Sequence, residues 1–243
     1  MALWSPARKL DPSVLDEALG RARAVAPRSV VVFDLDSTLL DNRPRQAVIL
    51  REFGELHGIA ELIAAKPEHW DGWSLRRAMM NAGMALADVE RWADEAKNFW
   101  RDRFFTSHYC ALDDAIDGAV AYVRAVLDAG AQVTYCTGRH EAMREGTVRS
   151  FHRLGFPDPG ASSRVQLLMK PTFEETDDDF KATAYARLHE LGTVVAAFDN
   201  EPTHINGYRV AFPEALAVHL DTDHSEREVT LLDGIPSIPH FRR

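Results

Sequence analysis

The chain has 243 residues, of which 46% are hydrophobic and 27% charged, enough for one large domain or for a core with a sizeable insertion. Lys and Arg number 28 against 37 Asp and Glu, and the net charge of -9 argues against binding to nucleic acid. No segment approaches the roughly 18 apolar residues of a membrane span, and no apolar signal segment follows Met1. We therefore expect a cytoplasmic protein that binds neither nucleic acid nor membrane. Cys110 and Cys136 lack the spacing of a disulfide framework or zinc site, and no pattern indicates an oligomeric state.

The predicted elements alternate between strand and helix. A helix is expected between Pro12 and Pro27, where apolar residues recur at helical spacing. The next segment, 29–33, is an unbroken apolar run typical of a strand buried on both faces of a parallel sheet. Similar runs occupy 131–136, 164–169, 193–198 and 215–220, and the helical patterns before two of them end at Gly130 and Gly192. This order predicts an α/β fold, a doubly wound parallel sheet with helices on both faces.

One block interrupts the alternation. Residues 42–112 contain several helical patterns, many aromatic residues and no convincing strand. We interpret this block as a helical insertion into an α/β core that comprises residues 1–41 and 113–243. Its aromatic side chains are expected to form a small core of their own, and some of them to line a substrate pocket.

Polar residues follow the predicted strands. Asp34 and Asp36 come directly after the first strand, Thr137-Gly138-Arg139 after the second, and Asp199 after the fourth. Two lysines lie between the second and fourth strands: Lys170 at a strand end, and Lys181 in the first turn of the next helix. Because ligands of such sheets bind at the carboxyl ends of the strands, we expect these side chains to converge.

The order of these segments resembles the four motifs of the haloacid dehalogenase-like (HAD) superfamily. The motif segments are VVFDLDSTLL, VTYCTGR, a lysine, and VVAAFDNEP, and the resemblance covers about residues 29–220. It implies the same (Rossmannoid) sheet, with the helical insertion as a cap domain between the first two motifs. Asp34 and Asp199 can supply carboxylates to Mg²⁺, a hard cation that prefers oxygen ligands. By resemblance, the backbone carbonyl of Asp36 is a further metal ligand, while its side chain points elsewhere.

These residues predict a chemical mechanism. Asp34 would attack phosphorus and form an aspartyl-phosphate. Asp36 would act as the general acid and base, which requires a pKa nearer neutrality than that of its metal-bound neighbour. Thr137, with nearby backbone N–H groups, would hold a phosphoryl oxygen, and a lysine would neutralise the charge around the transferring group.

Several assignments stay open on sequence alone. Lys181 is preferred as the motif lysine, because related branches with a lysine after the strand and another opening the helix use the second. Lys170, Gly138 and Arg139 are candidate substrate-binding residues, and Arg139 could instead form a salt bridge to Glu141, Glu145 or the cap. The nearest acid after Asp199, Glu201, suits either a water-mediated metal contact or a first-turn position facing the helix dipole.

The function predicted first is that of an Mg²⁺-dependent phosphatase acting on a small phosphorylated molecule. Dehalogenation ranks far behind. Carbon–halogen displacement needs no proton donor for the leaving group, and the superfamily's dehalogenases lack the second Asp, which this chain has as Asp36. Two alternatives remain: a phosphotransferase or phosphomutase that uses the same intermediate, and a HAD-like binding module without turnover.

Overall fold

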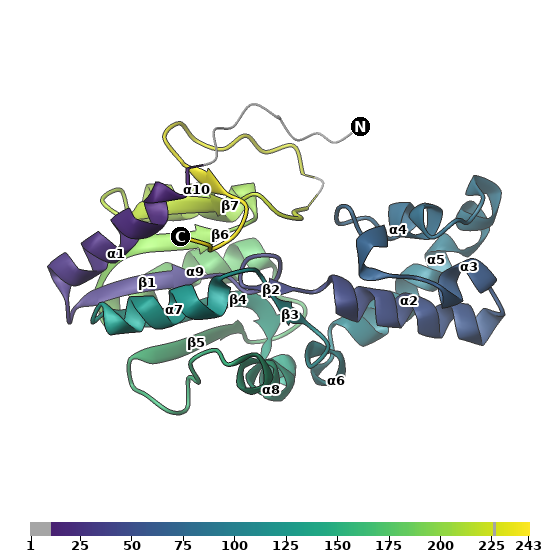
Figure 1. The fold of residues 1–243 in the computed structure, drawn as a ribbon, viewed down its shortest axis with the longest axis horizontal. Helices are drawn as coiled ribbons and strands as arrows, with labels where there is room; N and C mark the ends of the chain where they lie inside the picture. Colours follow the sequence, from purple (N-terminus) through teal and green to yellow (C-terminus); the bar gives the residue numbers. More distant parts are fainter. Residues whose placement is uncertain (1–10, 226) are drawn as a thin grey trace.

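A computed structural model describes residues 11–225 and 227–243, so residues 1–10 of the predicted core lie outside the described part. The core is a six-stranded parallel sheet with the order β5-β4-β1-β6-β7-β8 (Figure 1). Its strands are β1 (Ser29–Phe33), β4 (Gln132–His140), β5 (Val165–Lys170), β6 (Thr193–Asp199), β7 (Leu216–Leu220) and β8 (Ser237–Ile238). The chain winds outward from β1 in both directions, which confirms the predicted doubly wound sheet.

Helices cover both faces of this sheet because each strand is apolar on both sides. In β1, Val31 and Phe33 pack in one hydrophobic cluster, whereas Val30 and Val32 pack in another. The first cluster includes residues of α1 (Ser13–Val25), α7 (Ala119–Asp128) and α8 (Arg144–Leu154). The second includes residues of α9 (Asp177–Leu191) and α10 (Pro202–Ala211). A 3₁₀ turn, η2 (Glu141–Met143), precedes α8.

Residues 42–112, which lie between β1 and α7 in the chain, form a separate helical segment to one side of the sheet (Figure 1). Its elements are α2 (Arg43–His57), α3 (Ala60–Ile63), η1 (Pro67–His69), α4 (Leu75–Asn81), α5 (Leu86–Phe104) and α6 (Ser107–Cys110). Phe53, Trp70 and Met79 belong to a hydrophobic cluster of this segment alone, as expected for its aromatic residues. Two short strands, β2 (Leu40–Asp41) and β3 (Asp114–Ala115), pair antiparallel where the segment begins and ends. Both connections to the sheet therefore lie side by side.

Strand β4 is longer than the sequence predicts. It continues through Thr137 and Arg139 to His140, with a shift of register against β5 between Thr137 and His140. The second motif therefore lies at the end of the strand itself, where its backbone turns out of regular pairing. Within residues 11–225 and 227–243, no helix has the length and apolar character needed to cross a membrane.

Candidate active site

The carboxyl ends of β1, β4 and β6 meet at a cavity of about 250 Å³. Trp73, Phe104 and Phe105 of the helical segment also line it. The residues from the four motifs that line this cavity are Asp34, Asp36, Thr137, Gly138, Arg139, Lys181, Asp199, Asn200 and Glu201. The structure therefore brings together the predicted site residues, except that Lys170 does not line the cavity.

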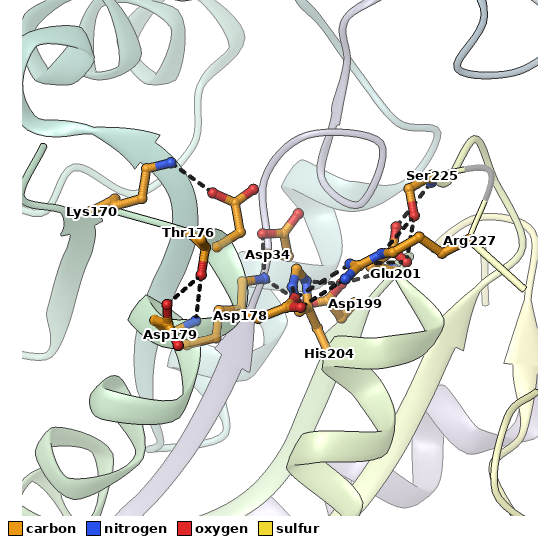
Figure 2. Close-up of polar contacts among 12 residues, drawn as sticks. Asp34, Lys170, Thr176, Asp178, Asp179, Asp199, Glu201, His204, Ser225 and Arg227 are labelled. Carbon is orange, nitrogen blue, oxygen red and sulfur yellow. Dashed lines mark hydrogen bonds and ion pairs between the residues drawn. The ribbon is translucent and has the colours of Figure 1, made fainter. Parts of the chain in front are cut away.

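Asp34, Lys181 and Asp199 form a buried group at the centre of the site. The Lys181 Nζ donates to Asp34 Oδ1 at 2.7 Å and to Asp199 Oδ2 at 2.5 Å, and Figure 2 shows Asp34 and Asp199 at neighbouring strand ends. The backbone N–H of Asp34 bonds to the Phe198 carbonyl, which continues the pairing of β1 with β6. Two carboxylates from distant parts of the chain thus lie within reach of one cation.

The pKa values of these three groups depend on their burial and on one another. Burial raises the pKa of Asp34 to about 7, although the Lys181 ammonium opposes this rise. Burial would also raise the pKa of Asp199, but Lys181 and His204 lower it below its ordinary value. Burial would lower the pKa of Lys181, yet the two carboxylates raise it, so this lysine stays charged.

The oxygen donors at this site fit Mg²⁺ in their chemistry. Mg²⁺ is usually held by one or two carboxylates together with substrate phosphate and water. Asp34 and Asp199 supply two carboxylates that already share one cationic partner, the Lys181 ammonium. Among the described residues, no group of three or more His, Cys, Asp or Glu side chains is arranged to hold a metal ion. Two carboxylates would hold such an ion only together with substrate phosphate and water.

A tight turn presents Asp36 to the cavity. Ser37 has a φ of 59°, in the left-handed region, and its N–H donates to the Leu40 carbonyl at 2.8 Å. Thr38 extends this turn to the fourth motif, because its Oγ1 donates to Asn200 Oδ1 and accepts from the Asn200 N–H, both at 3.0 Å. The first and fourth motifs are thereby joined by direct hydrogen bonds.

The side chain of Asp36 is bound by two arginines. Arg139 Nε donates to Asp36 Oδ2 at 2.9 Å and Arg139 Nη2 to Oδ1 at 2.7 Å, while Arg45 Nη2 donates to Oδ1 at 2.9 Å. Burial would raise the pKa of Asp36, but the two guanidinium groups hold it well below its ordinary value. This differs from the expected pKa nearer neutrality, because the sequence did not reveal the two arginine contacts.

The prediction that Arg139 binds substrate phosphate is not supported. Its side chain is 1% exposed, and its nitrogens donate to Asp36, Asp113 and Thr147. The alternative salt bridge exists, but its partners are Asp36 and Asp113 rather than Glu141 or Glu145. Arg139 is an internal counter-ion, with little of its guanidinium left for a ligand.

The two candidate lysines occupy different places. Lys170 Nζ donates to Asp177 Oδ1 at 2.8 Å and lies apart from Asp34 and Asp199 (Figure 2). The same carboxylate lies against Gly138, where an added Cβ would be 2.5 Å from Asp177 Oδ2. Lys170 and Gly138 therefore both adjoin the Asp177 carboxylate at the start of α9. Lys181 is the lysine that reaches the central acids, in agreement with its preference on sequence grounds.

The side chain of Glu201 binds the loop that contains Ser225 and Arg227. Its carboxylate accepts from the backbone N–H and the Oγ of Ser225, at 2.9 and 2.8 Å, and forms an ion pair with Arg227 at 3.4 Å (Figure 2). It lies immediately before α10, and its side chain makes no cap hydrogen bond there. Thr137, 1% exposed, accepts through its Oγ1 from the Arg139 N–H at 3.2 Å and is one of the residues that line the cavity.

Two charged residues of the site are absent from the sequence predictions. Arg45 and Asp113 have fully buried side chains that form an ion pair at 2.9 Å. A signal for Arg45 was present, since it shares helical spacing with the buried Ile49 and Phe53 and so lies on the apolar face of α2. A charge on such a face needs a buried partner. No pattern in the sequence distinguishes Asp113 from the adjacent Asp114.

Comparison with known proteins gives structural likeness only. The sequence matches no family model and no curated protein sequence. Protein Tyrosine Kinase A from Mycobacterium tuberculosis is 16% identical over 88% of this chain and 94% of that chain, with a TM-score of 0.54. A predicted phosphoglycolate phosphatase from Haemophilus somnus is 12% identical over 88% of this chain and 95% of that chain, with a TM-score of 0.51.

A further solved structure, a HAD hydrolase of family IA, variant 3, from Entamoeba histolytica, is 15% identical over 88% of this chain and 93% of that chain, with a TM-score of 0.49. At these identities the first two likenesses establish a shared fold and leave the chemistry to the site itself. The chain therefore shares with the predicted phosphoglycolate phosphatase a fold built on a parallel sheet.

Proposed function

We propose that this protein is an Mg²⁺-dependent phosphatase that hydrolyses a small phosphorylated molecule through an aspartyl-phosphate on Asp34. The observation that carries the proposal is the sharing of one buried ammonium, Lys181 Nζ, by Asp34 and Asp199 at the floor of a cavity. An anionic nucleophile can attack an anionic phosphate only where positive charge lies between them. The site supplies this charge from Lys181 and the donors for a cation from the two carboxylates.

In the first step, a carboxylate oxygen of Asp34 forms a bond to phosphorus as the bond to the leaving-group oxygen breaks. That oxygen takes a proton from Asp36, whose carboxyl lines the same cavity and must carry this proton at the first step although Arg139 and Arg45 favour its carboxylate form. Lys181 and Thr137 flank the transferring group, and Lys181 neutralises part of its charge. The phosphoryl group is then bound covalently to Asp34, and the alcohol is free to leave.

In the second step, water attacks phosphorus and the bond to Asp34 breaks. Asp36 takes a proton from this water, for which it must be a carboxylate. The paired guanidinium groups of Arg139 and Arg45 favour that form. Phosphate then leaves, and the Asp34 carboxylate is regenerated.

Asp34, Asp199 and the backbone carbonyl of Asp36 are the groups that would hold Mg²⁺. Bound there, the ion would supply Lewis-acid stabilisation of charge on the phosphoryl oxygens.

The helical segment of residues 42–112 is proposed to act as a cap over an α/β core of residues 1–41 and 113–243. Trp73, Phe104 and Phe105 extend from it to the cavity, where apolar side chains help to exclude water. A second cavity of about 1020 Å³ shares Ser37, Trp73 and Asp223 with the first. It offers room for the part of the substrate that leaves with the alcohol oxygen.

Phosphate release from a panel of phosphorylated metabolites and p-nitrophenyl phosphate tests this function, with kcat/KM ranked at fixed Mg²⁺. We expect turnover that stops with EDTA and returns when Mg²⁺ is added. Adding acceptor alcohols separates hydrolysis from phosphoryl transfer, since a transferase would pass the phosphoryl group to them. Absence of metal-dependent turnover on every ester would contradict the proposal and favour a binding module.

A further inference from the structure

Asp36 belongs to a closed network of four charged side chains, and the other three are buried. Arg45 and Arg139 both contact Asp36, and both also contact Asp113: Arg139 Nη2 donates to Asp113 Oδ2 at 2.6 Å, and Arg45 Nε lies 2.9 Å from Asp113 Oδ1. The side chains of Arg45, Arg139 and Asp113 are 0–1% exposed, whereas that of Asp36 is 26% exposed. Asp36 is therefore the member of the network that faces the cavity.

The network is balanced in charge. Two guanidinium groups face two carboxylates, so no unit of charge is left over in the interior. Taking one member away would leave a buried charge without its partner, which is costly. Asp113 contributes no atom to the cavity, and its role is to hold the two arginines that hold Asp36.

Arg45 is fixed from the helical segment. It belongs to α2, its guanidinium carbon lies 3.8 Å from the centre of the Phe104 ring, and its Nη1 donates to the Phe104 carbonyl at 3.0 Å. Asp113 lies between α6 and β3, where the chain returns to the sheet. Arg45 thus lies near the start of the helical segment and Asp113 directly after its end, and their side chains contact each other beside Asp36.

We propose that Arg45 and Asp113 are positioning residues for Asp36: together with Arg139 they fix its carboxylate toward the substrate's leaving group and link its placement to the helical segment. This inference rests on the proposed phosphatase function. Asp36 Oδ1 accepts from both arginines and Oδ2 from Arg139, so the rotation of the carboxylate is set by three hydrogen bonds. Without Arg45, the contact with Arg139 stays, and the Oδ1 atom loses one of its two anchors.

The test uses the dependence of rate on the leaving group. A misplaced general acid slows the ester that needs protonation, such as an alkyl phosphate, far more than p-nitrophenyl phosphate. A fault in folding or in phosphate binding slows all esters alike. For Arg45→Met we therefore measure kcat/KM across aryl and alkyl phosphate monoesters, because this quantity reports the step in which the leaving group departs.

We expect kcat/KM of Arg45→Met to fall about tenfold to hundredfold for the alkyl ester. For p-nitrophenyl phosphate we expect a fall of less than about threefold, so that log kcat/KM declines more steeply with leaving-group pKa. Asp113→Asn should also make log kcat/KM decline more steeply with leaving-group pKa. Arg45→Lys keeps the positive charge, so its activity on the alkyl ester should be higher than that of Arg45→Met. The second step also needs Asp36, which takes a proton from the attacking water, so Arg45→Met should slow the release of phosphate from Asp34. The aspartyl-phosphate should then accumulate, and p-nitrophenol should appear in an initial burst.

Matched controls and a second variant separate position from stability. Arg51→Met removes an arginine of the same helix that donates to the Ala65 carbonyl, and Asp114→Asn changes the exposed neighbour of Asp113. Both should leave the slope unchanged. The double variant Arg45→Met/Asp113→Asn removes one charge of each sign and leaves Asp36 paired with Arg139. It should therefore fold, with the steep slope retained.

The results test the positioning role of Arg45 and Asp113 separately from the proposed phosphatase function. Variant lines that run parallel to that of the wild type, whatever their height, would overturn the positioning role and leave the phosphatase intact. A wild-type protein that hydrolyses none of the esters would overturn the function and the positioning role together.

Discussion

Lys181 contacts the acid of the first motif and that of the fourth. It donates to Asp34 and Asp199 from a side chain that is 2% exposed, whereas Lys170, 9% exposed, pairs with Asp177. Both lysines precede Asp199 in the sequence, which does not show that their ion-pair partners differ. The partners are known only once α9 is placed against β1 and β6. The electrostatic argument therefore favours Lys181 as the group that stabilises charge on the transferring phosphoryl.

Replacement of each lysine by methionine tests this difference. Lys181→Met should lower kcat by roughly 100-fold or more, because it removes a preorganised positive charge from the reacting centre. Lys170→Met should lower kcat by less than about tenfold, since its ammonium is held by Asp177 outside the cavity. Steady-state kinetics at saturating substrate measures both, with circular dichroism to confirm folding. An equal loss in the two variants would contradict the assignment.

For individual residues, the sequence predicted which side chains lie near one another but not which of them form ion pairs. Asp34, Asp36, Thr137 and Asp199 could be placed, because each follows an apolar run that predicts a buried strand. The pairing of Asp36 with Arg139 spans 103 positions, and it involves two further buried charges with no motif of their own. Local pattern carries no information about such a partner, so the pKa of Asp36 was predicted in the wrong direction.

Among the elements, the strands with long apolar runs were predictable and the short ones were not. Segment 29–33 coincides with β1, and 193–198 differs from β6 by one residue. β2, β3 and β8 have two residues each, too few to show a period, and they exist because the chain beside them supplies a partner. β4 extends past its apolar run because its pairing with β5 resumes at His140.

The start of α7 shows where backbone geometry restricts the sequence. Gly118 precedes this helix with a φ of 77°, and an added Cβ would lie 2.6 Å from the backbone carbon and oxygen of Phe241. The C-terminal residues pack here, and the Phe241 N–H donates to the Asp117 carbonyl at 2.8 Å. A side chain at position 118 would strain the turn and displace this part of the chain.

Gly118→Ala should therefore lower the free energy of unfolding by roughly 2–4 kcal/mol, from the left-handed φ and the close contact together. Gly20→Ala is the matched control. Gly20 lies within α1 with nothing within 4 Å of an added Cβ, so alanine should raise the free energy of unfolding by roughly 0.5–1 kcal/mol. Urea denaturation of both variants measures the two changes, and a Gly118→Ala protein as stable as the wild type would refute the packing argument.

At the scale of the whole molecule, side chains of the sheet and of the helical segment line one cavity, and most of the segment's buried apolar side chains form a hydrophobic cluster of their own. The sheet carries Asp34 and Asp199 at its strand ends, and the helical segment brings Trp73 and Phe104 to the same cavity. The break in the alternation of strand and helix predicted that residues 42–112 form a helical insertion. The cavity itself was not predictable, because its walls come from loops such as 221–225 that have no periodic pattern.

The central claim is that Asp34 becomes phosphorylated during turnover. Its most direct test is to mix the wild-type enzyme with labelled substrate and Mg²⁺, quench in acid within one turnover, and locate the label by peptide mapping. We predict a phosphoryl group on the peptide that contains Asp34, and no label and no turnover in a folded Asp34→Asn variant. Undiminished phosphate release by Asp34→Asn, or turnover by the wild type with the label on another residue, would contradict the account.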